Sequence, residues 1–90
     1  MRIRWTDPAR SELRDAITYI AADNPPAAMQ TRNRVVEAIE GLAAFPRSGR
    51  PGRVADTREL PIRGTPFVAV YKVGGDIVIL RLRHGARRYP

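Results

Sequence analysis

The chain has 90 residues, of which 43% are hydrophobic, and this is enough for one domain with a modest core and too many for a disordered chain. It has a net charge of +7, no cysteine and a single histidine, His84, which argues against a disulfide framework, thiolate chemistry and a bound metal or other cofactor. No apolar run approaches the length of about 20 residues that crosses a membrane, and the N-terminus lacks the apolar core of a signal peptide, so we expect one cytoplasmic domain spanning residues 1–90.

The positive charge is confined to the second half of the chain. Residues 1–45 carry six Arg and six Asp or Glu, whereas residues 46–90 carry nine Arg and one Lys against three acids. Arg presents a planar fork to carboxylate or phosphate and is a poor general base, although high genomic GC content would also favour Arg over Lys. The charge distribution predicts an anionic or acidic partner for the second half.

The first half is predicted to form a short strand followed by two helices. Apolar Ile3 and Trp5 alternate with Arg over residues 2–5, which is typical of a strand. Thr6-Asp7-Pro8 marks a helix start, and Asn24-Pro25 marks another, which is expected to run to about Ala44. The connection between the two apolar helical stripes is short, so the helices should form an antiparallel hairpin.

The second half is predicted to form three strands. Residues 46–56 are rich in Gly, Pro and Arg and read as a basic, somewhat mobile surface loop. Residues 57–62, 67–73 and 77–83 follow as strands separated by short turns, which favours an antiparallel meander. The expected fold is α+β, in the order β-α-α-β-β-β, with the helix hairpin packed on one face of a small antiparallel sheet.

Two basic segments are candidate sites. In the last strand and tail, Arg81 and Arg83 share one face, and His84 can move a proton near neutral pH. Together with Arg87 and Tyr89, His84 could cleave RNA without a metal. Alternatively, His84 simply ends the strand, while the arginines are solvated or contact an acidic partner.

The loop offers the second candidate, because its arginines could hold phosphates and its glycines permit a close backbone approach. It lacks the flanking strand and the Lys-Ser/Thr pair of a P-loop, and a solvated loop fits the sequence equally well. Asp56 and Glu59 have no apolar context that would raise a pKa, so two-carboxylate hydrolysis is not expected. The candidate contacts to phosphate or to an acidic partner are Arg47, Arg50, Arg53 and Arg58.

The chain as a whole resembles the RelE/ParE superfamily of toxins from bacterial type II toxin–antitoxin systems. The resemblance runs in order through nearly all 90 residues. It is carried by Arg4-Trp5-Thr6, Asp23-Asn24-Pro25, Gly49-Arg50-Pro51-Gly52, Arg58-Glu59-Leu60, the strand 67–73 and the ending 81–90. It implies a two-helix hairpin on an antiparallel sheet. It also implies growth inhibition, plasmid stabilisation, and neutralisation by an acidic ParD-like or RelB-like antitoxin that holds operator DNA in the hetero-oligomeric complex.

The resemblance leaves two mechanisms open. RelE-like members cleave mRNA on the ribosome, whereas ParE-like members poison DNA gyrase and lack the nuclease residues. Phe67 stands near the position of a nuclease strand Arg, and the Lys cluster of the nucleases is not matched, which favours the ParE-like branch. Whether the chain is catalytic stays open at this point. In a gyrase poison, the expected target contacts are Arg81, Arg83, Arg87 and Arg88.

Overall fold

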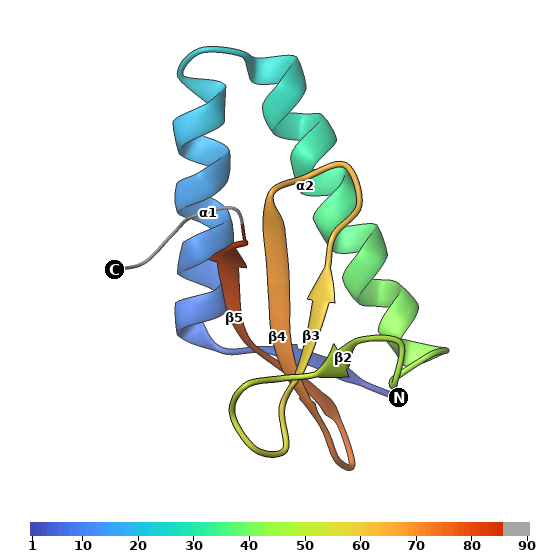
Figure 1. The fold of residues 1–90 in the computed structure, drawn as a ribbon. Helices are drawn as coiled ribbons and strands as arrows, with labels where there is room; N and C mark the ends of the chain where they lie inside the picture. Colours follow the sequence, from blue (N-terminus) through green and yellow to red (C-terminus); the bar gives the residue numbers. More distant parts are fainter. Residues whose placement is uncertain (86–90) are drawn as a thin grey trace.

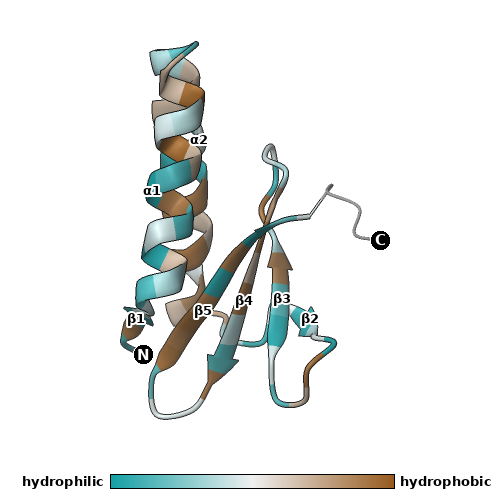
Figure 2. Ribbon diagram, turned by 90° about the vertical axis from the view of Figure 1, so that its left-hand side faces the viewer, coloured by the Kyte–Doolittle hydropathy of each residue, from teal (hydrophilic) through white to brown (hydrophobic). Residues whose placement is uncertain are grey.

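The computed structural model describes residues 1–85, in which two helices cover one face of a five-stranded sheet (Figure 1). Figure 2 shows the helix pair and the sheet as two separate layers. The elements in chain order are β1 (Ile3–Trp5), α1 (Asp7–Ala21), α2 (Pro25–Glu40), the 3-10 turn η1 (Gly41–Ala43), β2 (Arg50–Pro51), β3 (Arg58–Pro61), β4 (Phe67–Val73) and β5 (Ile77–His84). The predicted α+β fold and its order of helices and strands are confirmed.

Both helices begin where the capping residues predict. The Thr6 hydroxyl accepts a hydrogen bond from the Ala9 N–H at 3.2 Å, and the Asn24 side chain accepts one from the Ala27 N–H at 3.1 Å. Each helix has proline in its first turn, where a missing N–H costs no hydrogen bond. Thr6 also donates to the Leu80 carbonyl at 2.8 Å, so the cap of α1 is tied to β5.

The sheet differs from the expected antiparallel meander at its two edges. Strands β3, β4 and β5 pair antiparallel as predicted, and the full strand order is β1-β5-β4-β3-β2. β1 pairs with β5 in parallel, which makes the sheet mixed. Parallel neighbours need a long connection, and here both helices and three strands lie between the two strands in the sequence. The loop before β3 contributes the two-residue strand β2, which its Pro and Gly content concealed.

The core lies between the helices and the sheet. Along β4, Phe67, Ala69 and Tyr71 are buried on the helix side, while the intervening valines are half-buried on the far side. A bulge in β5 lets Tyr71 pair with Ile79 and Val70 pair with Arg81. The extra residue changes the direction of β5 and of the side chains that follow the bulge, which include Arg81 and Arg83.

No helix among residues 1–85 is long and apolar enough to span a membrane.

Candidate functional site

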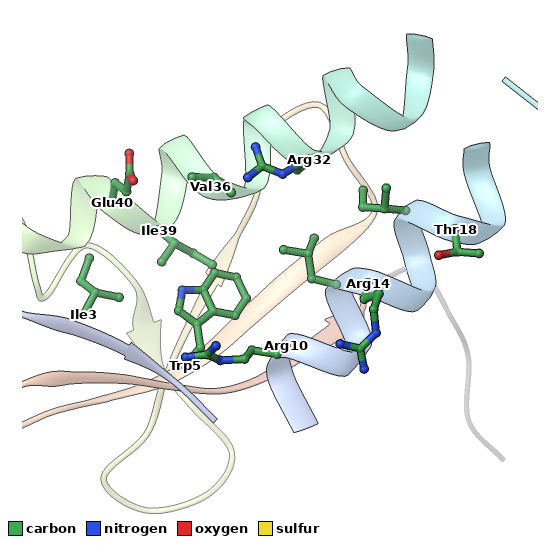
Figure 3. Close-up of a pocket in the computed structure, with 11 residues that line it drawn as sticks. Ile3, Trp5, Arg10, Arg14, Thr18, Arg32, Val36, Ile39 and Glu40 are labelled. Atoms are coloured by element: carbon green, nitrogen blue, oxygen red, sulfur yellow. The ribbon is translucent and has the colours of Figure 1, made fainter. Parts of the chain in front are cut away.

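An apolar groove of about 600 Å³ lies between the two helices and β1 (Figure 3). The Trp5 side chain reaches from β1 into the space between α1 and α2. Apolar side chains from the three elements line the groove, and Arg10, Arg14 and Arg32 stand among its polar residues. Such a groove suits a partner segment with apolar anchors and acidic flanks. The apolar lining consists of Ile3, Trp5, Leu13, Ile17, Val36 and Ile39.

The basic loop is anchored to the sheet by Tyr71. This residue is fully buried, and its hydroxyl accepts from the Gly49 N–H at 2.9 Å and donates to the Pro46 carbonyl at 2.8 Å. A Cβ at Gly49 would lie 2.6 Å from that hydroxyl, so only glycine allows this approach. Arg58 adds a hydrogen bond from its guanidinium to the Gly49 carbonyl at 2.7 Å. Side chains of the adjacent strands therefore bind the backbone at the start of the predicted loop, at Pro46, Arg47 and Gly49.

The four predicted contact residues of the loop and β3 separate into two kinds. Arg47 and Arg53 have exposed side chains. Arg58 is half-buried and engaged with loop carbonyls, so it serves the loop conformation directly. Arg50 reaches the Glu59 carboxylate at 3.4 Å.

Glu59 is a buried carboxylate that joins three segments of the chain. It is 6% exposed, and its two oxygens contact the Arg50 guanidinium from β2, the Arg53 N–H from the loop and the Arg83 guanidinium from β5, at 3.2 to 3.5 Å. The Arg53 N–H contributes most to lowering the pKa of Glu59. With the Arg50 and Arg83 guanidiniums it outweighs the effect of burial, so the side chain stays ionised. This role of Glu59 could not be predicted from the sequence, because its partners come from separate segments that only the folded sheet brings together.

The side chains of Arg81 and Arg83, both in β5, contact different acidic residues. The Arg81 guanidinium binds Glu12 of α1 through two nitrogens, with its Nε 3.0 and 3.1 Å from the two oxygens. The same carboxylate accepts from the Leu82 N–H at 2.8 Å. Burial alone would raise the pKa of Glu12, but the hydrogen bonds from Arg81 and Leu82 outweigh it and lower the pKa. The two arginines predicted to act on one face are thus held by separate partners.

His84 lies at the end of β5 beside Phe67 of β4. The two rings meet edge to face with their centroids 5.5 Å apart. The Nδ1 atom of His84 is buried and has no hydrogen-bond partner among the described residues. His84 and Phe67 also line a pocket of about 780 Å³ between α1 and β5, with Asp15 and Tyr19 on the helix side. Among the described residues, no group is therefore placed to exchange a proton with the Nδ1 atom of His84.

The remaining predicted tail residues, Arg87, Arg88 and Tyr89, lie outside the described residues. Within residues 1–85, no group of three or more His, Cys, Asp or Glu side chains is placed to hold a metal ion.

The polar residues of the helix groove were not predicted from the sequence. Arg10 and Arg14 lie one turn apart on α1, and Arg32 lies on α2 across the groove. Glu40 also lines the groove, so its polar rim carries three arginines against one acid, and the balanced charge of the first half concealed this local excess. Helical spacing of Arg10 and Arg14 beside the apolar stripe of α1 was the available signal.

The sequence is similar to members of a toxin family along nearly its whole length. Residues 3–89 match the family described as ParE toxin of type II toxin–antitoxin system, parDE. The protein Y4kP of Sinorhizobium fredii is 39% identical over 99% of this chain and 93% of its own length. Toxin RelE2 of Caulobacter vibrioides is 33% identical over 96% of this chain and 97% of its own length.

Solved structures show the same arrangement. A chain of the chromosomal ParDE system from P. aeruginosa superimposes with a TM-score of 0.84 at 30% identity, covering 93% of this chain and 95% of that chain. A chain of the RelBE2 toxin–antitoxin complex from Mycobacterium tuberculosis gives a TM-score of 0.67, also at 30% identity, over 92% of this chain and 95% of that chain. Both are similar in sequence as well as in fold.

Proposed function

Because the chain belongs to the ParE toxin family of type II toxin–antitoxin systems, we propose that it arrests growth by binding and poisoning DNA gyrase. The observation that carries this choice is the packing of His84. A general acid or base must lie within hydrogen-bond reach of the proton it moves, and a partner usually orients it. Here Phe67 packs on the imidazole, and Nδ1 is buried without a hydrogen-bond partner among the described residues. This arrangement supports a binding toxin over a nuclease.

The second candidate is a ribosome-dependent mRNA endonuclease. It is favoured by one observation, the position of His84 at the end of β5 next to Arg83 and beside a pocket that could admit a nucleotide. In that mechanism His84, Arg87 and Tyr89 would carry the chemistry.

The partner of the toxin is proposed to be a cognate antitoxin, ParD-like or RelB-like, in a hetero-oligomer that contacts operator DNA through the antitoxin. Both similar structures come from systems that contain an antitoxin. The helix groove supplies an apolar floor, and Arg10, Arg14 and Arg32 at its edge suit acidic side chains. An acidic amphipathic segment lying in this groove would bury apolar anchors and neutralise the rim.

The experiment that separates the two functions uses purified toxin in two assays. In one, it is added to gyrase with plasmid DNA, and in the other to translating ribosomes with mRNA. Trapped double-strand breaks or blocked supercoiling, with mRNA intact, is the expected result. Codon-phased mRNA cuts with gyrase unaffected would refute the gyrase proposal and establish the second candidate.

A further inference from the structure

We propose that Arg50 and Arg83 form a single phosphate-binding site on the sheet face opposite the helices, and that Glu59 is the positioning residue that holds the two guanidinium groups together. The two arginines are 33 residues apart in the sequence and come from β2 and β5, with β3 and β4 between those strands in the sheet. Each contacts a different oxygen of the Glu59 carboxylate, at 3.4 and 3.5 Å.

The strand register places this cluster on the far face. Residues paired across antiparallel strands point to the same side of a sheet. Ala69, which packs in the core, pairs with Leu60 and Leu82, whereas its neighbours Val70 and Val68 pair with Glu59 and Arg83. Glu59 and Arg83 therefore lie on the side that no helix covers, and Arg50 reaches them from the adjoining strand.

The contacts of Arg50 and Arg83 with Glu59 leave guanidinium N–H donors available for a ligand. Charge-assisted N–H···O bonds that are fully formed are about 2.7–2.9 Å long, and both arginine contacts to Glu59 are longer. The side chains of Arg50 and Arg83 are 62% and 36% exposed, while that of Glu59 is 8% exposed. One buried negative charge thus orients two positive groups that still face solvent, and the cluster keeps a net positive charge.

A buried carboxylate contributes little net stability to a small domain. Desolvation of the charge offsets much of the Coulomb attraction, so apolar residues would stabilise the fold as well. A role in orienting the Arg50 and Arg83 guanidiniums explains the buried Glu59 carboxylate better, because a site that binds a ligand through two groups needs both held in a fixed orientation.

The ligand that fits two guanidinium forks is a phosphate group. A phosphodiester offers two non-bridging oxygens, as a carboxylate does, but in nucleic acid it lies in a regular chain of like charges that can engage two forks and the neighbouring arginines together. Arg47 and Arg53, which lie just before and just after β2, have exposed side chains that extend this positive surface. This inference is independent of whether gyrase or the ribosome is the target, because both work on nucleic acid.

The test exploits the sign of a charge change. Glu59→Gln raises the net charge by one unit, so simple electrostatics predicts tighter binding to a short fluorescent DNA duplex. A positioning role predicts weaker binding, by on the order of tenfold, measured by fluorescence anisotropy. Asp56→Asn is the matched control, because it makes the same charge change at an exposed position in the loop just before β3, and Asn tolerates the positive φ of 66° found there. It should leave binding unchanged or tighten it.

Arg83→Lys and Arg50→Lys keep every charge and remove one fork each, so they test the site even if Glu59→Gln fails to fold. Each should weaken duplex binding several-fold. Tighter binding by Glu59→Gln, or wild-type binding by both lysine variants, would overturn the proposal. An oligoglutamate peptide of equal charge that competes as well as the duplex, and loses affinity in the same variants, would overturn the assignment to phosphate. None of these measurements contains gyrase or ribosomes, so their outcome is separate from that of the proposed function.

Discussion

Two acidic side chains, Glu12 and Glu59, bind the arginine side chains of Arg50, Arg81 and Arg83. Glu12 satisfies the Leu82 N–H at the end of β5 and holds Arg81, while Glu59 holds Arg50, Arg83 and the backbone of Arg53. At this scale the sequence was least informative. Both acids look like ordinary surface residues in their own elements, and their partners are 6 to 70 positions away. Only the register of the folded sheet brings these groups together.

The carboxylates of Glu12 and Glu59 make the free energy of unfolding depend on pH. Both have a pKa below the ordinary 4.5 in the folded state, so the unfolded chain binds more protons as the pH falls. The stability that they contribute is therefore fully present above 4.5 and is lost as the pH falls through the lower folded values. We expect the urea midpoint of the wild type to drop more steeply below about pH 4.5 than that of Glu12→Gln/Glu59→Gln. Equal slopes for the two proteins would contradict the linkage.

At the scale of elements, local signals predicted the helices and the meander. Thr6 and Asn24 cap the helices as expected, and the apolar alternation of residues 67–73 gives β4 its buried face. The parallel pairing of β1 with β5 was not predictable from the strand itself, because a three-residue strand can pair in either direction. The anchored loop was missed for a similar reason: its partner, Tyr71, lies 22 residues beyond Gly49.

The helix groove yields a prediction about α2. Val36→Glu places a negative charge in the apolar floor, where it would be desolvated and would repel an acidic antitoxin segment. Antitoxin affinity, measured by calorimetry, should fall by at least about tenfold while growth arrest by the toxin alone persists. Met29→Glu is the matched control, since Met29 lies on the same helix, is 57% exposed and does not line the groove. Equal loss of affinity in both variants would show that the antitoxin does not bind specifically in the groove.

For the whole molecule, the charge distribution predicts how association depends on salt. Residues 46–90 carry the entire net charge of +7, and the helix groove adds a local basic rim to the first half. Long-range attraction speeds the encounter with an acidic partner and is screened as ionic strength rises. Stopped-flow association with the antitoxin should slow as salt increases, while dissociation changes little. An association rate that does not vary with salt would remove electrostatic steering from the mechanism.

The most direct test of a toxin that acts by binding is to remove its only imidazole. His84→Ala should leave the amount of linear plasmid that gyrase accumulates in the presence of toxin close to the wild-type level, because His84 has no proton to transfer in a binding mechanism. A nuclease would instead lose about two to four orders of magnitude in mRNA cleavage rate on the same substitution. Linear plasmid at the wild-type level, with circular dichroism confirming a folded variant, is the predicted result. Absence of gyrase-linked breaks with the wild-type toxin, together with mRNA cleavage that His84→Ala abolishes, would contradict it.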